Sequence, residues 1–231
     1  MCLGIDILNP IRGELRRVEN LMAAYLKTPY NEIGPFNDHT RRKSGKKLRP
    51  AITILFGRMC GLDDERTLKL GACLELLHTS TLIHDDVIDN AATRRGQETH
   101  NALWDNTLTV LYGDFVFSSA MQLAVELGDL DALRMIASLT RDLVTGELLQ
   151  HANGFQFPPA RDRYRDIIRL KTAVLFSGCC ALPVVLTRKD GLVDVAGRIG
   201  SRIGTAFQVI DDCLDYMADD RLGKPRLIDL K

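Results

Sequence analysis

The sequence lacks an excess of charge of either sign, because 30 basic and 30 acidic residues cancel over 231 positions. A general nucleic-acid binder would be basic overall and a disordered acidic tail would shift the balance the other way, so both classes are excluded. The chain also lacks a signal peptide and any run of about 18 apolar residues that could cross a bilayer. We therefore expect a cytoplasmic protein with no membrane span and no nucleic-acid partner.

The chain also lacks the spaced cysteine pairs of a zinc site or a disulfide framework. Cys179 and Cys180 are adjacent and badly placed to bridge each other, which favours buried, reduced thiols. No EF-hand loop, no phosphate-binding GxxxxGK[ST] loop and no repeat of solenoid length is present. The six cysteines are Cys2, Cys60, Cys73, Cys179, Cys180 and Cys213.

Helical periodicity dominates what is present, and apolar residues make up 45% of the chain, enough for one core. The segment from Thr67 to Asp89 is apolar on more than one face, which is typical of a helix in the middle of a bundle. Gly197, Gly200 and Gly204 form a smooth stripe for close helix packing. We predict an all-α, single-domain bundle with helices at roughly 6–26, 50–60, 65–90, 106–127, 130–153, 161–188 and 192–218.

Three aspartates stand within five positions of LIHDDVIDNAATRRG, residues 82 to 96. On a helix Asp85 and Asp89 lie one turn apart on one face, with Asp86 beside them. Like charges at this spacing repel unless a cation lies between them, and carboxylate oxygens without Cys or His pairs suit magnesium. We interpret His84 as a hydrogen-bonding neighbour rather than a ligand.

The same DDxxD spacing returns in FQVIDDCLDY as Asp211, Asp212 and Asp215. If each acidic type is about 6% of residues, one chance DDxxD has a probability of roughly 0.05 and two roughly 0.001. Chance is therefore a poor explanation. Magnesium shares its shell with substrate phosphates, so two facing clusters predict a diphosphate ligand.

Basic residues lie where such a ligand would need them. Arg94 and Arg95 follow the first cluster, Lys171 lies in RLKTA, and Lys224 follows the second cluster. Arginine binds phosphate through two parallel hydrogen bonds, whereas lysine acts as a point charge. The stretch SGKKLRP adds Lys46 and Arg49, although alone it would more often be a solvated loop.

With these motifs in order, the chain resembles the trans-isoprenyl diphosphate synthases, the polyprenyl synthetase family. The resemblance runs from about Lys46 to Lys231 through GKKLRP, ELLHTSTLIHDDVIDNAATRRG, YGDFVFSSA, GELLQ, LKTA, GTAFQVIDDCLDY and GKPRLIDLK. It implies an isoprenoid synthase bundle whose central helices enclose the active-site cavity, and it implies a homodimer. Two DDxxD clusters with the intervening motifs are highly specific.

The resemblance also implies a role for each matching residue. Three Mg²⁺ ions would be held by Asp85, Asp86, Asp89, Asp211, Asp212 and Asp215. The allylic diphosphate would be bound by Arg94, Lys171 and Lys224, and isopentenyl diphosphate by Lys46, Arg49, His78 and Arg95. Thr172 and Gln208 would line the reaction centre beside Lys171 and stabilise the carbocation. For His78 the motif outweighs the ordinary interpretation of a core histidine.

The expected reaction is magnesium-assisted ionisation of the allylic diphosphate, condensation with isopentenyl diphosphate and proton loss, giving an all-trans polyprenyl diphosphate. A non-catalytic subunit of a two-component synthase is the alternative, but it would be expected to have lost acids or anchors that stand here. A class I terpene cyclase usually carries one aspartate cluster and a different second metal motif.

Product length is predicted from the helix that carries Asp85. Ser80 and Thr81, about one turn before it, are small where short-chain family members often carry a large aromatic. Leu77 and then Leu74 are the next bulky residues, so we expect a product longer than fifteen carbons, with the final floor on a facing helix.

One departure from the family lies at the end of the sequence. The chain stops at DLK231, where the family usually continues through several more helices. We expect residues 1–231 to form an isoprenoid synthase domain without those helices, with core surface exposed and the second cluster loosened.

Overall fold

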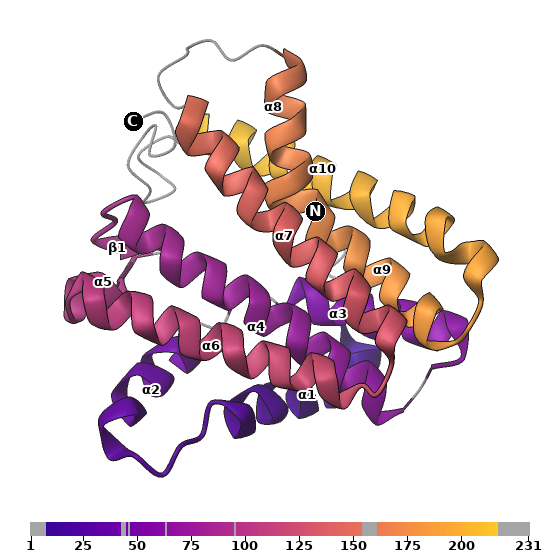
Figure 1. Ribbon diagram of the computed structural model, residues 1–231, viewed down its shortest axis with the longest axis horizontal. Helices are drawn as coiled ribbons and strands as arrows, with labels where there is room; N and C mark the ends of the chain where they lie inside the picture. The colour runs from indigo at the N-terminus through magenta and orange to yellow at the C-terminus, as the bar shows by residue number, and fades with distance from the viewer. Residues whose placement is uncertain are drawn as a thin grey trace.

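A computed structural model describes residues 8–42, 45, 47–62, 64–94, 96–153 and 161–216, which fold almost entirely into helices (Figure 1). A π-helical segment, Arg169–Ala173, joins α8 to α9. Single 3-10 turns, Asn9–Ile11, Asn31–Ile33 and Asp190–Leu192, precede α1, α2 and α10. The all-α prediction is confirmed. The α-helices are α1 (Arg12–Tyr25), α2 (Gly34–Arg42), α3 (Leu48–Cys60), α4 (Glu65–Ile88), α5 (His100–Leu103), α6 (Asn106–Glu126), α7 (Leu130–Asn153), α8 (Arg161–Ile168), α9 (Val174–Leu186) and α10 (Val193–Tyr216).

Helix α4 is the central helix of the bundle, as its apolar sequence predicts. It begins where the Asp64 side chain accepts a hydrogen bond from the Arg66 backbone N–H at 2.9 Å. It packs along α6 and against α1, α3 and α9 (Figure 1). Its leucines face these neighbours, and burial of each stabilises the fold by about 1.5–3 kcal/mol. The leucines of α4 exposed by 1% or less are Leu70, Leu74, Leu76 and Leu77.

The glycine stripe on α10 lets that helix lie directly on α9. A Cβ at Gly200 would stand 2.3 Å from the Phe176 carbonyl oxygen, and one at Gly204 would stand 2.6 Å from the Ala173 Cα. Larger residues would therefore separate the two helices. The interpretation of this stripe as a close packing surface is confirmed.

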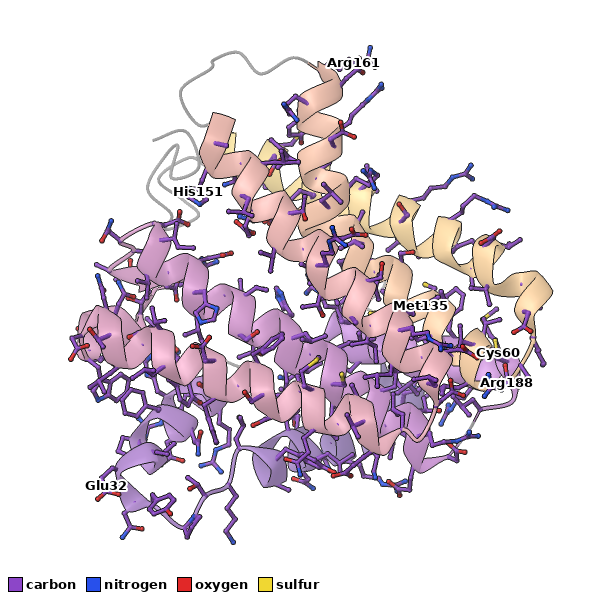
Figure 2. The ribbon with its side chains drawn as sticks, viewed as in Figure 1. Glu32, Cys60, Met135, His151, Arg161 and Arg188 are labelled. Carbon is purple, nitrogen blue, oxygen red and sulfur yellow. The ribbon has the colours of Figure 1, made fainter. Side chains whose placement is uncertain are left out.

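Different elements lie at the two ends of the bundle. At one end Lys189 donates a hydrogen bond to the Cys60 carbonyl at 2.9 Å, tying the turn after α9 to the end of α3. Cys60 and Arg188 mark this end in Figure 2, and His151 marks the other, near the carboxyl end of α7. The hairpin that follows α4 also lies away from Cys60 (Figure 1).

Three local features were not predicted from the sequence. The helix expected at 161–188 is interrupted by the π-helical segment. Helix α2 is a further helix, and the hairpin of β1 (Thr93–Arg94) and β2 (Gln97–Glu98) pairs Thr93 with Glu98. Helix α2 has a mostly polar sequence, GPFNDHTRR, so its position depends on contacts with distant residues, including a stack of Phe36 on Trp104 at 4.1 Å.

Length and composition alone would allow two helical segments to cross a membrane, Asn106–Glu126 and Arg161–Leu186. The second is 72% buried within the bundle, as a core helix is, and the first is 44% buried. Burial of this kind is that of a core helix, so neither segment is strong evidence for a membrane span. The cysteines in the described part of the chain are free thiols.

Apolar residues are exposed along one face of α10. Their spacing of three or four positions places them in a row on the helix. They include Val195, Ile199, Ile203, Phe207, Ile210 and Leu214, each between 38% and 59% exposed.

Candidate active site

The first aspartate cluster lies at the carboxyl end of α4. Asp85 and Asp86 are 8% and 3% exposed, whereas Asp89 is exposed and caps the helix, its N–H donating to the Asp85 carbonyl at 2.8 Å. The carboxyl end of a helix carries partial negative charge, which makes acids there unfavourable. Buried acids at this position therefore need cations nearby.

Two such cations come from other elements. The Arg94 Nε on β1 lies 2.6 Å from the Asp86 Oδ1. The Lys171 Nζ on the π-helical segment lies 3.8 Å from the Asp85 Oδ2 and 3.0 Å from the Glu147 Oε2 on α7. The structure therefore brings two of the predicted diphosphate anchors onto the first cluster.

Burial and charge act against each other in this cluster. Burial raises the pKa of Asp85 to about 7, and Lys171 only partly opposes it. Burial lowers the pKa of Lys171, but Asp85 and Glu147 outweigh this, so its pKa lies above the ordinary value. Burial likewise lowers the pKa of Arg94, but Asp86 outweighs this effect, so its pKa also lies above the ordinary value. A hard divalent cation would offset the burial of these carboxylates, so the donor set fits magnesium.

The π-helical segment directs neighbouring side chains to different parts of the site. Lys171 reaches α4 and α7, while the Thr172 hydroxyl donates to the Gln208 Oε1 on α10 at 2.6 Å. Such π-bulges are frequent at functional sites. Helix α7 approaches this segment closely at Gly146, where a Cβ would stand 2.8 Å from the Lys171 backbone nitrogen. This explains the glycine of the GELLQ motif.

The second cluster is held by neutral side chains. Gln208 Nε2 donates to the Asp212 Oδ1 at 2.7 Å, and the Tyr164 hydroxyl donates to the other oxygen of Asp212. Asp211 is exposed. The side chain of Asp215 lies outside the described residues. Within the described ranges no three His, Cys, Asp or Glu side chains converge into a ready metal site.

Lys47 and Arg49 of the GKKLRP stretch contact α4 and α9. Lys47 has a left-handed backbone (φ 52°), and its Nζ lies 3.5 Å from the Glu75 Oε1, with both side chains about one-tenth exposed, at 11% and 9%. Glu75 precedes His78, which is half-buried, by about one turn. Arg49 places its guanidinium carbon 4.9 Å from the centre of the Phe176 ring. The predicted anchors Lys46, Arg95 and Lys224 lie outside the described residues.

His84 contacts α6 rather than the carboxylates beside it. Its Nε2 lies 3.2 Å from the Val110 carbonyl and 3.4 Å from the Asp114 Oδ1. A Cβ at Gly113 would stand 2.3 Å from the same nitrogen, so the glycine of YGD leaves room for the imidazole. The structure supports the interpretation of His84 as a hydrogen-bonding neighbour.

The residues predicted to control product length are packed inside the bundle. The Ser80 hydroxyl donates to the Leu77 carbonyl at 2.9 Å, and the Thr81 hydroxyl donates to the His78 carbonyl at 2.8 Å. Both hydroxyls are therefore satisfied by their own helix. A separate apolar groove of about 500 Å³ lies between α6 and α7, and its lining includes Phe117, Met121, Val144 and Leu148.

Three residues of the site were not predicted. Glu147 and Glu75 belong to the motifs GELLQ and ELLH, so the sequence held a signal for them, although only the structure shows their lysine partners. Tyr164 belongs to no motif and reaches Asp212 across 48 positions. Its role follows from the packing of α8 alone.

Comparisons with known proteins identify the family of this chain. A family model described as polyprenyl synthetase matches residues 31–231. An all-trans-nonaprenyl-diphosphate synthase (geranyl-diphosphate specific) of Rhodobacter capsulatus is 34% identical over 95% of this chain and 68% of its own length. The octaprenyl diphosphate synthase of Escherichia coli is 38% identical over 78% of this chain, which spans only 56% of that protein.

Solved structures give the same fold. A polyprenyl synthase from Caulobacter crescentus, complexed with calcium and isoprenyl diphosphate, superposes with a TM-score of 0.90 at 32% identity. The match covers 96% of this chain and 68% of that one.

Proposed function

The chain belongs to the polyprenyl synthetase family, and we propose that it is a prenyltransferase that condenses isopentenyl diphosphate with an allylic diphosphate to an all-trans polyprenyl diphosphate. One observation carries the proposal. Asp85 and Asp86, buried at the end of α4, are paired with Lys171 and Arg94 from two other elements. Buried acids and matching cations at one point suit a charged ligand that brings its own metal ions.

The metal that the site would hold is Mg²⁺, as three ions. Asp85, Asp86 and Asp89 would hold it from α4, and Asp211, Asp212 and Asp215 from α10. The raised pKa of Asp85, caused first by burial, supports this fit because a divalent cation would favour the charged carboxylate. When bound, magnesium supplies positive charge against the diphosphate.

The side-chain cations change partners when substrate binds. Lys171 and Arg94 hold Asp85 and Asp86 in the structure described here. With metal held by the carboxylates, both cations would be available to bind the allylic diphosphate together with Lys224. Their charge stabilises the leaving diphosphate, so the allylic C–O bond can ionise.

The other site residues act on the carbocation and on the second substrate. The oxygens of Thr172 and Gln208 stabilise the cation, and the apolar walls exclude the water that would quench it. Isopentenyl diphosphate is bound by Lys46, Arg49, His78 and Arg95. Its double bond attacks the cation, and a proton leaves to the released diphosphate.

The product is longer than fifteen carbons. Ser80 and Thr81 are small and leave the path along α4 open, with Leu77 one turn deeper. The floor of the path would lie on a helix that faces α4. The names of the relatives, octaprenyl and nonaprenyl synthases, support a product of this length.

The chain forms a homodimer through α6 and α7 and acts in the cytoplasm. Apolar residues exposed on these helices support the dimer, including Leu111 and Val125 on α6 and Val144 and Leu148 on α7. Free cysteine thiols support a reducing compartment. Residues 1–231 form one isoprenoid synthase domain.

Product analysis with magnesium, isopentenyl diphosphate and an allylic primer tests the function. Asp89→Ala and Asp211→Ala should each lower turnover by about 10²-fold or more, since both carboxylates are exposed ligands rather than packing residues. Circular dichroism should show the helical content unchanged. Near-normal turnover in either variant would contradict the proposed metal site.

A further inference from the structure

We propose that side chains of α2 position the hairpin that carries Arg94. They do so through a cluster that we call the α2 clasp, which consists of Asn37, His39 and Thr40 of α2, His100 of α5 and Tyr112 of α6. The inference rests on the proposed function, in which Arg94 binds the allylic diphosphate. The clasp residues would be positioning residues, since in the structure they contact the hairpin and its neighbours rather than the carboxylates.

The clasp contains a chain of hydrogen bonds with one direction. Tyr112 donates its hydroxyl proton to the Asn37 Oδ1 at 3.0 Å, so its oxygen must accept from the Thr40 hydroxyl, 2.9 Å away. Thr40 then accepts from the His100 Nε2 at 3.1 Å. The Asn37 amide donates to the Leu26 carbonyl at 2.7 Å, at the end of α1. Helices α1, α2, α5 and α6 are thereby tied together.

His39 connects this network to the hairpin itself. Its Nε2 lies 3.0 Å from the Glu98 carbonyl oxygen on β2, and because a carbonyl can only accept, the imidazole donates. Glu98 pairs with Thr93 on β1, directly before Arg94. One hydrogen bond from α2 therefore acts on the strand pair that carries the arginine.

Contacts between aromatic rings also hold the clasp residues together. His39 meets the His100 ring edge to face at 4.6 Å, and His100 stacks on Tyr112 at 5.2 Å. Phe36 stacks on Trp104 at 4.1 Å beside them. Such aromatic pairs add about 0.5–1.5 kcal/mol each beyond burial, which restricts how far α2 can shift.

The hairpin needs this support because it is very short. Each strand has two residues, and an isolated two-stranded hairpin is only marginally stable in water. Its base is closed by the Thr99 hydroxyl, which donates to the Ala91 carbonyl at 2.6 Å. Beyond that base, the clasp limits where Arg94 can lie relative to Asp86. A displacement of about 1 Å can cost about 10²-fold in rate.

A pair of variants at one position tests the clasp. His39→Leu keeps an apolar side chain against Trp104 but removes the donor, whereas His39→Gln restores a side-chain N–H that can reach the Glu98 carbonyl. Hydrogen–deuterium exchange of the peptide spanning the two strands should be about tenfold faster in His39→Leu than in wild type, and close to wild type in His39→Gln. The kcat/KM for the allylic diphosphate should fall about 5- to 20-fold in His39→Leu alone.

Thr187→Val is the matched control. It removes a hydroxyl that donates to carbonyls of α9, at the turn between α9 and α10, and should change neither measurement. Hairpin exchange in His39→Leu equal to wild type, or accelerated equally in a peptide from α1, would overturn the clasp. A wild-type protein that makes no polyprenyl product would count against the proposed function, whereas the exchange measurement would still decide the clasp.

Discussion

Gly146→Ala should damage the site more than it damages the fold. The added Cβ would stand 2.8 Å from the Lys171 backbone nitrogen and 2.9 Å from the Leu170 Cβ. Both contacts are shorter than real Cβ atoms tolerate, and the first is with backbone, which cannot rotate away. Either α7 or the π-helical segment must therefore move.

The expected loss of stability is small. Alanine in place of a helical glycine gains about 0.5–1 kcal/mol, whereas overpacking costs about 1–3 kcal/mol. The free energy of unfolding should therefore fall by about 1 kcal/mol, which leaves a domain of ordinary stability folded. Lys171 lies on the π-helical segment and its partner Glu147 lies on α7, so movement of either element disturbs their contact. A shift of about 1 Å at a charged anchor can cost about 10²-fold in kcat.

Urea unfolding and steady-state kinetics separate the two effects, and Gly13→Ala is the control. Gly13 also lies in a helix, but a Cβ there meets nothing within 4 Å, so this variant should be as stable and active as wild type or better. Magnesium-dependent binding of an unreactive allylic diphosphate analogue gives a measurement that does not need turnover. If Gly146→Ala binds and reacts like Gly13→Ala, the close approach of α7 has no role in placing Lys171.

Two other variants test the prenyl path and the GKKLRP stretch. Ser80→Phe should shift the product distribution to shorter chains, measured by chromatography of the dephosphorylated products, with Ser80→Ala as its control. An active Ser80→Phe variant with unchanged products would refute the path along α4. Glu75→Gln should lower the free energy of unfolding by about 3 kcal/mol because it leaves Lys47 buried without its carboxylate. Glu65→Gln, which breaks the exposed pair with Arg17, should cost less than about 1 kcal/mol in the same urea measurement. Equal costs for the two variants would contradict the role assigned to the buried pair.

The long helices could be predicted because their apolar patterns are sustained over many turns. The segments predicted at 65–90, 106–127 and 130–153 correspond to Glu65–Ile88, Asn106–Glu126 and Leu130–Asn153. Helix α2 could not, because Phe36 is its only large apolar side chain and its place is set by Trp104 and Tyr112. The π-helical segment could not be predicted from its own sequence, because RLKTA fits an α-helix equally well.

The sequence indicated which residues belong to the site, but it did not indicate which of them contact each other. The DDxxD spacing pointed to Asp85 and Asp86 and the basic residues to Arg94 and Lys171, and the structure places these four side chains together. Which cation lies on which acid depends on how β1 and the π-helical segment pack, and no sequence spacing encodes that. Glu147 illustrates the limit, because its motif was visible while its ion pair with Lys171 depends on Gly146 letting α7 approach.

The same ion pairs bear on how folding and metal binding are related. A small domain whose metal ligands converge only around the ion gains its folding energy from the metal. Here Arg94 lies 2.6 Å from the buried Asp86, and Lys171 lies 3.8 Å from Asp85 and partly opposes the effect of its burial. The bundle therefore places a side-chain cation beside each buried acid of the first cluster. Under the proposed function, metal and substrate would replace pairs that are already formed, so binding energy would go into exchanging partners at a site whose helices are already in place.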